Sequence, residues 1–472
     1  MLPMLMLEIM TYVLALWLGL YLIGRDPAKP QLLYAGLGLA AYAVSLAAMT
    51  LAAASPSALA TAWLTRLHWS LLFVPAVFWL GAMIYLLPDE APARDRLSQW
   101  WRIGGPALAM GLVGLSLATS LIFEVTPDAA RPGPAYPIFV VGLGLCLGAS
   151  VALIVRAYRA ASVKLPLGLL LAAVIFFGLS LGLMLAPLDG LPRGWLVLGM
   201  SLDLAILGVV IAVLDAFAEG ETLLPDFFRS LDGALLFVLI FAGPVVATML
   251  LATGPTLPLL ALLLINITAA IAVQIFADPL QSSLDRVAFA AFPGLRQARA
   301  DLRTTASALP RLNEALDLNN LDEDEFIRLT RRTLSHLGNL PRLATSPLTR
   351  LPLIDSRLAE RDAPDNTLER AAELKRLLAE SIAQLKPPTA DSFGTTEEWR
   401  HYNALYFPYV AGLRPYSRRA EYDDDDLDPA AAEALDWFRT YVPERTLYNW
   451  QNAAAKLVAQ HLREEWRMKN GE

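Results

Sequence analysis

The chain has 472 residues, of which 56% are hydrophobic and only 18% are charged, and its mean hydropathy is +0.45. A soluble globular chain has about 25% charged residues, so the composition excludes a wholly soluble protein. The formal net charge of −7 argues against a strongly basic nucleic-acid-binding surface. The single cysteine, Cys146, excludes a framework of internal disulfides and a cysteine-based metal site.

The N-terminal part contains apolar runs of the length that crosses a bilayer, which takes about 20 residues. The first run contains Glu8, has no basic residue before it and no small-residue cleavage site after it, so we expect a retained helix and not a signal peptide. We predict an all-α fold, a polytopic membrane bundle of about nine transmembrane helices at 1–277 followed by a cytoplasmic helical domain. The predicted spans are 4–23, 31–53, 65–87, 103–123, 136–158, 165–187, 195–217, 230–251 and 256–277.

The loops between the first spans alternate between many and few basic residues. The second loop has no Lys or Arg, and the fourth and sixth have only Arg131 and Arg193. Cytoplasmic loops retain basic residues, so we expect an inner-membrane protein with its N-terminus outside and its C-terminal domain in the cytoplasm. The basic residues of the first, third and fifth loops are Arg25, Lys29, Arg94, Arg96, Arg102, Arg156, Arg159 and Lys164.

Few polar residues lie within the spans. Asp203 is near the middle of the seventh span and Asn266 near the middle of the ninth. A carboxylate at this depth usually faces a partner or a cavity, so Asp203 belongs either to a ligand or proton site or to a hydrogen bond between helices, with Asn266 as a possible partner. Arg66 and His68 lie at the outer end of the third span, where they either line an outward pocket or anchor the helix at the interface.

Three segments share a pattern of helix lengths and aromatic positions with a known family. They are LYLIGRDPAKPQLLYAGLGLAAYAVSL, AWLTRLHWSLLFVPAVFWLGAMIYLL and DPLQSSLDRVAFAAF (Asp278–Phe292). The first two resemble the seven-helix membrane region that precedes bacterial sensor histidine kinases, and the third is similar to the juxtamembrane segment of those kinases. The resemblance spans residues from about 10 to 290 and implies a region that senses a signal and passes it inward.

The segment after the last span carries apolar residues at intervals of three or four, interrupted at Pro293-Gly294. This spacing predicts a juxtamembrane signalling helix over 278–310 with one apolar stripe. The stripe pairs either with a second copy of the chain, giving a homodimer, or with the chain's own domain. Its residues are Leu280, Leu284, Val287, Ala291, Leu295, Ala298, Leu302 and Leu309.

The output half of a histidine kinase is missing from the sequence. His336 lacks the adjacent carboxylate of a phosphoacceptor, and neither DxGxG nor GxGxxG follows it. GxSxG and P-loop motifs are also absent, and the four histidines lack metal-ligand spacing. We therefore expect no enzyme activity, catalytic residue, metal site or cofactor. The acidic run Glu421–Asp426 is either a divalent-cation site or, as we prefer, part of a solvated linker at 421–428.

The rest of the chain predicts a cytoplasmic helical domain at 311–420 and a C-terminal helical pair at 429–472. Pro443 suits the first turn of the last helix. This pair weakly resembles a bacterial helix-turn-helix, whose second helix reads bases through Asn and Arg. Alternatively, its polar face is the solvated side of an amphipathic helix. The candidate DNA-binding residues are Arg445, Tyr448, Asn449, Asn452 and Lys456.

The preferred function is a non-catalytic membrane sensor that passes a signal through the juxtamembrane helix to a cytoplasmic output domain. One alternative is a membrane-anchored, DNA-binding transcriptional regulator, and another is a transporter or channel subunit that uses Asp203. The expected partners are membrane lipid, a second copy of the chain, a cytoplasmic protein or DNA, and a small-molecule or lipid signal.

Overall fold

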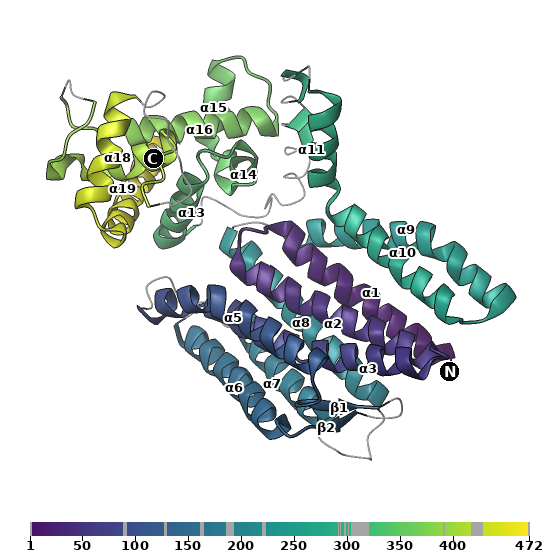
Figure 1. Cartoon of the computed structure of the whole chain (residues 1–472). Helices are drawn as coiled ribbons and strands as arrows, with labels where there is room; N and C mark the ends of the chain where they lie inside the picture. The colour runs from purple at the N-terminus through teal and green to yellow at the C-terminus, as the bar shows by residue number, and fades with distance from the viewer. Residues whose placement is uncertain are drawn as a thin grey trace. The chain divides into compact units, whose positions relative to one another are not determined.

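The structure, a computed structural model, divides the chain into two compact units (Figure 1). The membrane unit comprises Met1–Asp215 and Phe227–Leu284, and the second unit comprises Ala216–Asp226 and Asp285–Glu472. The described residues are 2–87, 92–126, 130–160, 165–185, 193–219, 223–290, 292, 294–296, 299–300, 302–303, 321–389, 392–416 and 428–470.

Nine helices in the described part of the chain are long and apolar enough to cross a membrane, and they overlap all nine predicted spans. The all-α, multi-pass membrane fold is therefore confirmed. These nine crossings comprise ten labelled helices, because the third crossing contains both α3 and α4: α1 (Leu2–Arg25), α2 (Pro30–Ala54), α3 (Ala58–Leu72), α4 (Val74–Ile84), α5 (Pro92–Ala118), α6 (Tyr136–Ala160), α7 (Leu165–Leu185), α8 (Arg193–Glu219), α9 (Leu224–Thr248) and α10 (Leu257–Ile275).

The third crossing consists of two helices, α3 and α4, which meet at Phe73. Pro75 lies in the first turn of α4 and has no N–H to donate back into α3, so the helical hydrogen bonding is interrupted there. After α5 a short antiparallel hairpin, β1 (Phe123–Val125) and β2 (Ala130–Pro132), leads to α6. Strands this short carry no readable alternation of apolar and polar residues.

Helices α1 and α2 pack backbone against backbone. A Cβ atom added to Gly36 would lie 2.5 Å from the carbonyl oxygen of Gly19, and one added to Gly19 would lie 2.9 Å from that of Gly36. Small residues allow this close approach between membrane helices. Helix α2 also packs against α3, α4 and α10, so it lies at the centre of this side of the unit.

The other side of the membrane unit is built on α4. Helices α5 and α6 each pack against α4, but their contact with each other is slight. In the α3–α4 crossing 83% of the most apolar window is buried, whereas the values for α5 and α6 are 17% and 22%. Helices α5 and α6 therefore face the surrounding lipid and leave a space between them over α4.

Helix α11 (Ala277–Ala288) follows α10 after Phe276, and its residues from Asp285 onward belong to the second unit, which is also helical. Its helices are α13 (Glu323–Ser335), α14 (Leu340–Ala344), α15 (Pro352–Glu360), α16 (Thr367–Ala383), α17 (Arg400–Leu405), α18 (Pro429–Tyr441) and α19 (Glu444–Asn470), with 3-10 turns at Pro347–Arg350 and Glu397–Trp399 and a π-helical turn at Tyr406–Val410.

One core joins most of the second unit. Ala454, Val458 and Leu462 of α19 belong to the same buried cluster as Phe326 of α13 and Leu377 of α16. Through α19, the predicted C-terminal pair at 429–472 shares this core with the predicted domain at 311–420, whereas α18 packs in a second buried cluster that also contains Phe407. The long helix α19 is mainly a packing element, with only part of its surface left for a partner.

The proline-rich stretch Pro341–Pro352 contains α14, a 3-10 turn and the start of α15. Proline is tolerated in the first turn of a helix, where its missing N–H has no intrahelical acceptor. The acidic run Glu421–Asp426 and three of the predicted stripe residues, Ala291, Ala298 and Leu309, lie outside the described residues.

Candidate functional site

A buried ion cluster joins the first loop to α8. Arg25 Nε lies 3.3 Å from Asp215 Oδ2, and Lys29 Nζ lies 2.6 Å from Asp215 Oδ1. The side chains of Arg25 and Asp215 are only 1% and 3% exposed. The two basic residues indicated the orientation of the chain in the membrane. Their contact with Asp215 could not be predicted, because nothing in the spacing pairs residues 190 positions apart.

Asp203 lies on α8 and is nearly buried, with 8% of its surface exposed. Ser180 of α7 donates a hydrogen bond to its carboxylate across 3.4 Å. Asn266 is partly exposed and donates instead to the carbonyl oxygen of Phe241 on α9, across 3.3 Å. The structure does not bring Asp203 and Asn266 together as we considered; each contacts a different neighbouring helix.

Arg66 and His68 of α3 also have different neighbours. The His68 ring is buried, and its Nδ1 lies 3.0 Å from the carbonyl oxygen of Ser45 on α2. The Arg66 guanidinium donates to the carbonyl oxygen of Leu117, at the end of α5, and to Ser120 Oγ, at 3.1 and 3.2 Å. His68 thus connects α3 to α2, whereas Arg66 places a partly exposed cation at the end of α5 nearest the hairpin.

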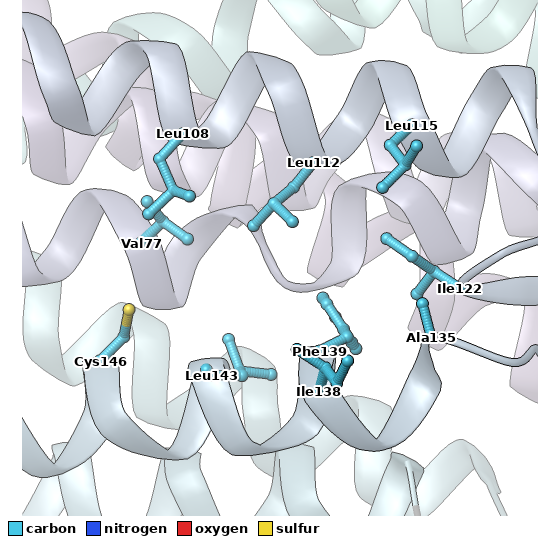
Figure 2. A pocket seen from close by; sticks show the side chains of 11 residues that line it. Val77, Leu108, Leu112, Leu115, Ile122, Ala135, Ile138, Phe139, Leu143 and Cys146 are labelled. Atoms are coloured by element: carbon cyan, nitrogen blue, oxygen red, sulfur yellow. The ribbon is translucent and has the colours of Figure 1, made fainter.

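The space between α5 and α6 is a cavity of about 210 Å³ with an apolar lining (Figure 2). Val77 of α4 contributes to one wall, and side chains of α5 and α6 point toward each other across the gap. The lining residues are Val77, Leu108, Leu112, Leu115, Ile122, Ala135, Ile138, Phe139, Gly142, Leu143 and Cys146. The cavity could not be predicted from the sequence, because apolar residues in three spans do not show which of them face one another.

Aromatic contacts hold the end of the cavity near the hairpin. The Phe139 ring packs edge-on against Phe73 at a centroid distance of 4.8 Å and against Phe123 of β1 at 5.6 Å. Trp69 and Tyr136 also contact Phe123. These neighbouring rings hold the Phe139 ring in place, and this ring forms the cavity wall at that end.

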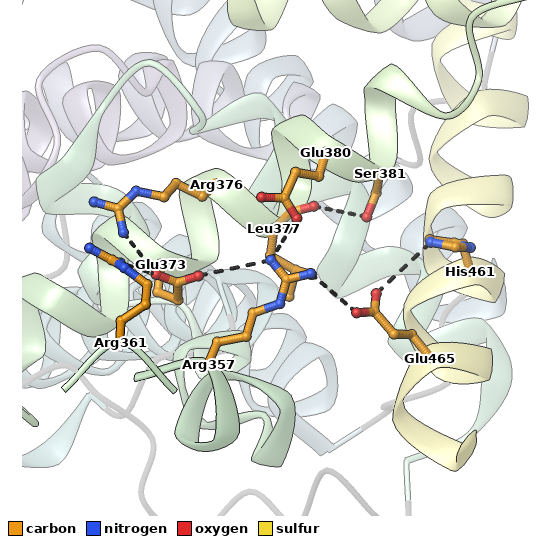
Figure 3. A network of polar contacts seen from close by, with 9 residues as sticks. All are labelled: Arg357, Arg361, Glu373, Arg376, Leu377, Glu380, Ser381, His461 and Glu465. Carbon is orange, nitrogen blue, oxygen red and sulfur yellow. Dashed lines mark hydrogen bonds and ion pairs between the residues drawn. The ribbon is translucent and has the colours of Figure 1, made fainter. Parts of the chain in front are cut away.

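In the second unit a charge network connects α15, α16 and α19 (Figure 3). Glu373 is buried and its carboxylate accepts from Arg361 at 2.5 Å and from Arg376 at 2.8 Å. Arg357 donates to Glu380 at 2.6 Å and to Glu465 of α19 at 3.1 Å. These contacts join the three helices around the core, so we interpret the network as structural.

Some of the candidate DNA-binding residues are exposed, whereas others are partly buried or contact another helix. Arg445, Asn449 and Lys456 are exposed on α19. Asn452 is partly buried, and its Oδ1 is enclosed without a hydrogen-bond partner among the described residues. Tyr448 accepts a hydrogen bond from Arg331 of α13, whose guanidinium also lies 4.7 Å from the tyrosine ring centroid. Of the five candidates, Tyr448 thus contacts α13 and Asn452 is partly buried, whereas the other three are exposed.

Helix α11 exposes its apolar stripe. Leu280, Leu284 and Val287 are 48%, 61% and 80% exposed. The buried residue of this helix, Asp285, pairs with Arg303 and, at 3.6 Å, with Arg299. The apolar side of α11 therefore has little packing within the described part of the chain.

Comparison of the chain with models of known protein families, with curated proteins and with solved structures found no match.

Proposed function

We propose that the chain is a non-catalytic receptor of the inner membrane, in which the membrane unit controls a helical output domain through α11. The observation that carries this proposal is the exposed apolar stripe of α11, directly after the last membrane span. A 12-residue helix is marginal in water without tertiary packing. The stripe therefore needs a partner.

A second copy of the chain is the partner that the spacing favours. Leu280, Leu284 and Val287 follow one another at intervals of four and three, which are those of the apolar seam in a coiled coil. Two copies would bury these residues against each other at the point where the chain leaves the membrane. A change in the membrane unit would then alter the pairing of α11 and the output domain that follows it.

The orientation that supports this proposal is an outward N-terminus. Arg25 and Lys29 lie in a loop that this orientation places in the cytoplasm, as the distribution of basic residues favours. Asp215, near the C-terminal end of α8, pairs with both of them. The same orientation puts α11 and the second unit in the cytoplasm.

Cysteine crosslinking tests the pairing of α11 in native membranes. The background is Cys146→Ala, which removes the single native thiol. Leu284→Cys and Val287→Cys place a thiol on the stripe, and Ser282→Cys places one on the opposite side of the same helix. We expect the two stripe variants to form covalent dimers under mild oxidation at least five times more efficiently than Ser282→Cys. Equal yields at all three positions would contradict the proposal.

DNA is the alternative partner of the output domain, and the exposure of Arg445, Asn449 and Lys456 favours it. The test is titration of the full-length protein in nanodiscs with a fluorescent DNA duplex at several salt concentrations. Binding that weakens steeply with salt, and is lost when these three residues are changed to alanine, would support a membrane-anchored regulator. Asn452 stays unchanged in this variant because its side chain is partly buried.

A further inference from the structure

The cavity between α5 and α6 has the properties of a binding site for a hydrocarbon chain. All its lining side chains are apolar except the thiol of Cys146. A water in a cavity needs two to four polar partners, and an engineered apolar cavity of about 150 Å³ stays dry and binds benzene. The cavity here is larger, at about 210 Å³, so a dry, apolar occupant fits it better than water does.

The cavity is also open toward the lipid. Ile138, Leu108 and Leu115 line it and are 77%, 41% and 38% exposed. Helices α5 and α6 are among the nine helices of the described residues that can cross a membrane, so these side chains meet the acyl chains of the bilayer. A chain can therefore enter sideways between α5 and α6 without crossing a polar layer.

The end of the cavity at the hairpin offers a place for a headgroup. Arg66 holds its guanidinium beside Leu117 and Ser120, just beyond the lining residue Leu115. Arg131 of β2 is exposed on the hairpin that follows. A phosphate near these cations would gain charge-assisted hydrogen bonds.

We propose that this cavity holds one acyl chain of a bilayer phospholipid, with the headgroup at the hairpin end. A phospholipid bound in this cavity would be a ligand of the proposed receptor, and this role rests on the proposed function. The binding itself does not, because it is measured without reference to α11.

Glycines on α6 provide a matched pair of variants. A Cβ atom added to Gly142 or to Gly144 would meet no atom within 4 Å. Gly142 lines the cavity, whereas Gly144 is absent from its lining. Leucine at Gly142 therefore fills the cavity without a backbone clash, and leucine at Gly144 makes the same change in helix propensity outside it.

Native mass spectrometry of the detergent-purified full-length protein tests the site. We expect the wild type and Gly144→Leu to retain one phospholipid, and Gly142→Leu to retain at least five times less. Wild-type protein without bound phospholipid, or equal retention by the two variants, would overturn the proposal.

The single thiol gives a second test that needs no variant. Cys146 lines the cavity and is partly exposed. We expect phosphatidylglycerol, added to delipidated wild-type protein, to slow the reaction of Cys146 with N-phenylmaleimide at least fivefold. An unchanged rate would overturn the proposal, whereas the crosslinking of α11 would be unaffected by that result.

Discussion

The α1–α2 contact and the α5–α6 gap use the same residue type for opposite purposes. Gly19 and Gly36 bring two backbones into direct contact, so that a Cβ atom on either would clash with the other. Gly142 on α6 faces open space in the cavity. Glycine in a membrane helix thus marks either a close contact or a gap, and only the positions of the neighbouring helices decide which.

This difference divides the membrane unit into a closed side and an open side. The closed side has a glycine contact and a buried ion cluster, Arg25–Asp215–Lys29, which resist rearrangement. The open side has lipid-facing helices around an apolar cavity. The proposed receptor would need both a frame that keeps its shape and a site whose occupant can change.

The largest expected effect comes from the ion cluster of the closed side. Asp215→Asn removes the carboxylate that Arg25 and Lys29 contact. Because breaking a buried pair leaves a buried charge, we expect a loss of about 3 kcal/mol in the free energy of unfolding. The measurement is SDS titration of the protein in mixed micelles. Asp232→Asn, at an exposed residue of α9, is the control and should change it by less than about 0.5 kcal/mol.

One glycine substitution on each side of the membrane unit tests whether the two sides differ in packing. Gly36→Ala places a methyl group against the Gly19 carbonyl oxygen and the Ile23 side chain, and overpacking of this kind costs about 1–3 kcal/mol. Gly144→Ala meets no atom, so its effect on unfolding should stay within about 0.5 kcal/mol of zero. If both variants lost equal stability in the same titration, the distinction between a closed and an open side would be wrong.

A variant in the second unit identifies which unfolding transition belongs to which unit. Glu373→Gln keeps the shape of a buried side chain but loses the charge that Arg361 and Arg376 contact. Both arginines are nearly half exposed, so we expect a loss of only about 1–2 kcal/mol. Glu380→Gln, at a mostly exposed carboxylate, is the control. A calorimetric scan should show the loss in one transition, different from the one that Asp215→Asn shifts.

The smallest expected effect is a pH dependence of the second unit. Burial lowers the pKa of His401, and the neighbouring Arg400 lowers it further. The unfolded chain, with a histidine pKa of about 6.5, then binds a proton that the folded unit resists. Stability should therefore fall as the pH drops below about 6.5, by less than about 1 kcal/mol for a partly exposed group. Unfolding midpoints at pH 5.5 and 7.5 would show this, and His401→Gln should reduce the difference.

The spans were predictable because each is a continuous run of about 20 apolar residues, a signal that needs no knowledge of neighbours. Helix α18 was also predictable, since Asp428 and the Val442-Pro443 break mark its ends. The start of α15 could not be predicted from Pro352 alone, because a proline can end a preceding helix as well as begin a new one.

The candidate sites were harder to predict because they depend on which helices meet. Asp203 stood out as an intramembrane acid, but its contact with Ser180 was not visible in the sequence. Asp215 and the cavity were not identified at all, since a charge near a span end and apolar residues within spans are ordinary features. The stripe of α11 was visible in its spacing, because a helical period is local.

The most direct test of the proposed receptor function asks whether a change on the open side of the membrane unit affects the pairing of α11. Dimer crosslinking at Leu284→Cys would be compared in native membranes between Gly142→Leu and Gly144→Leu, both with Cys146→Ala. We expect that filling the cavity through Gly142 changes the crosslinking yield at least twofold, while Gly144→Leu gives the same yield as the protein with neither glycine substitution. Equal yields in all three proteins would contradict the claim that the membrane unit controls α11.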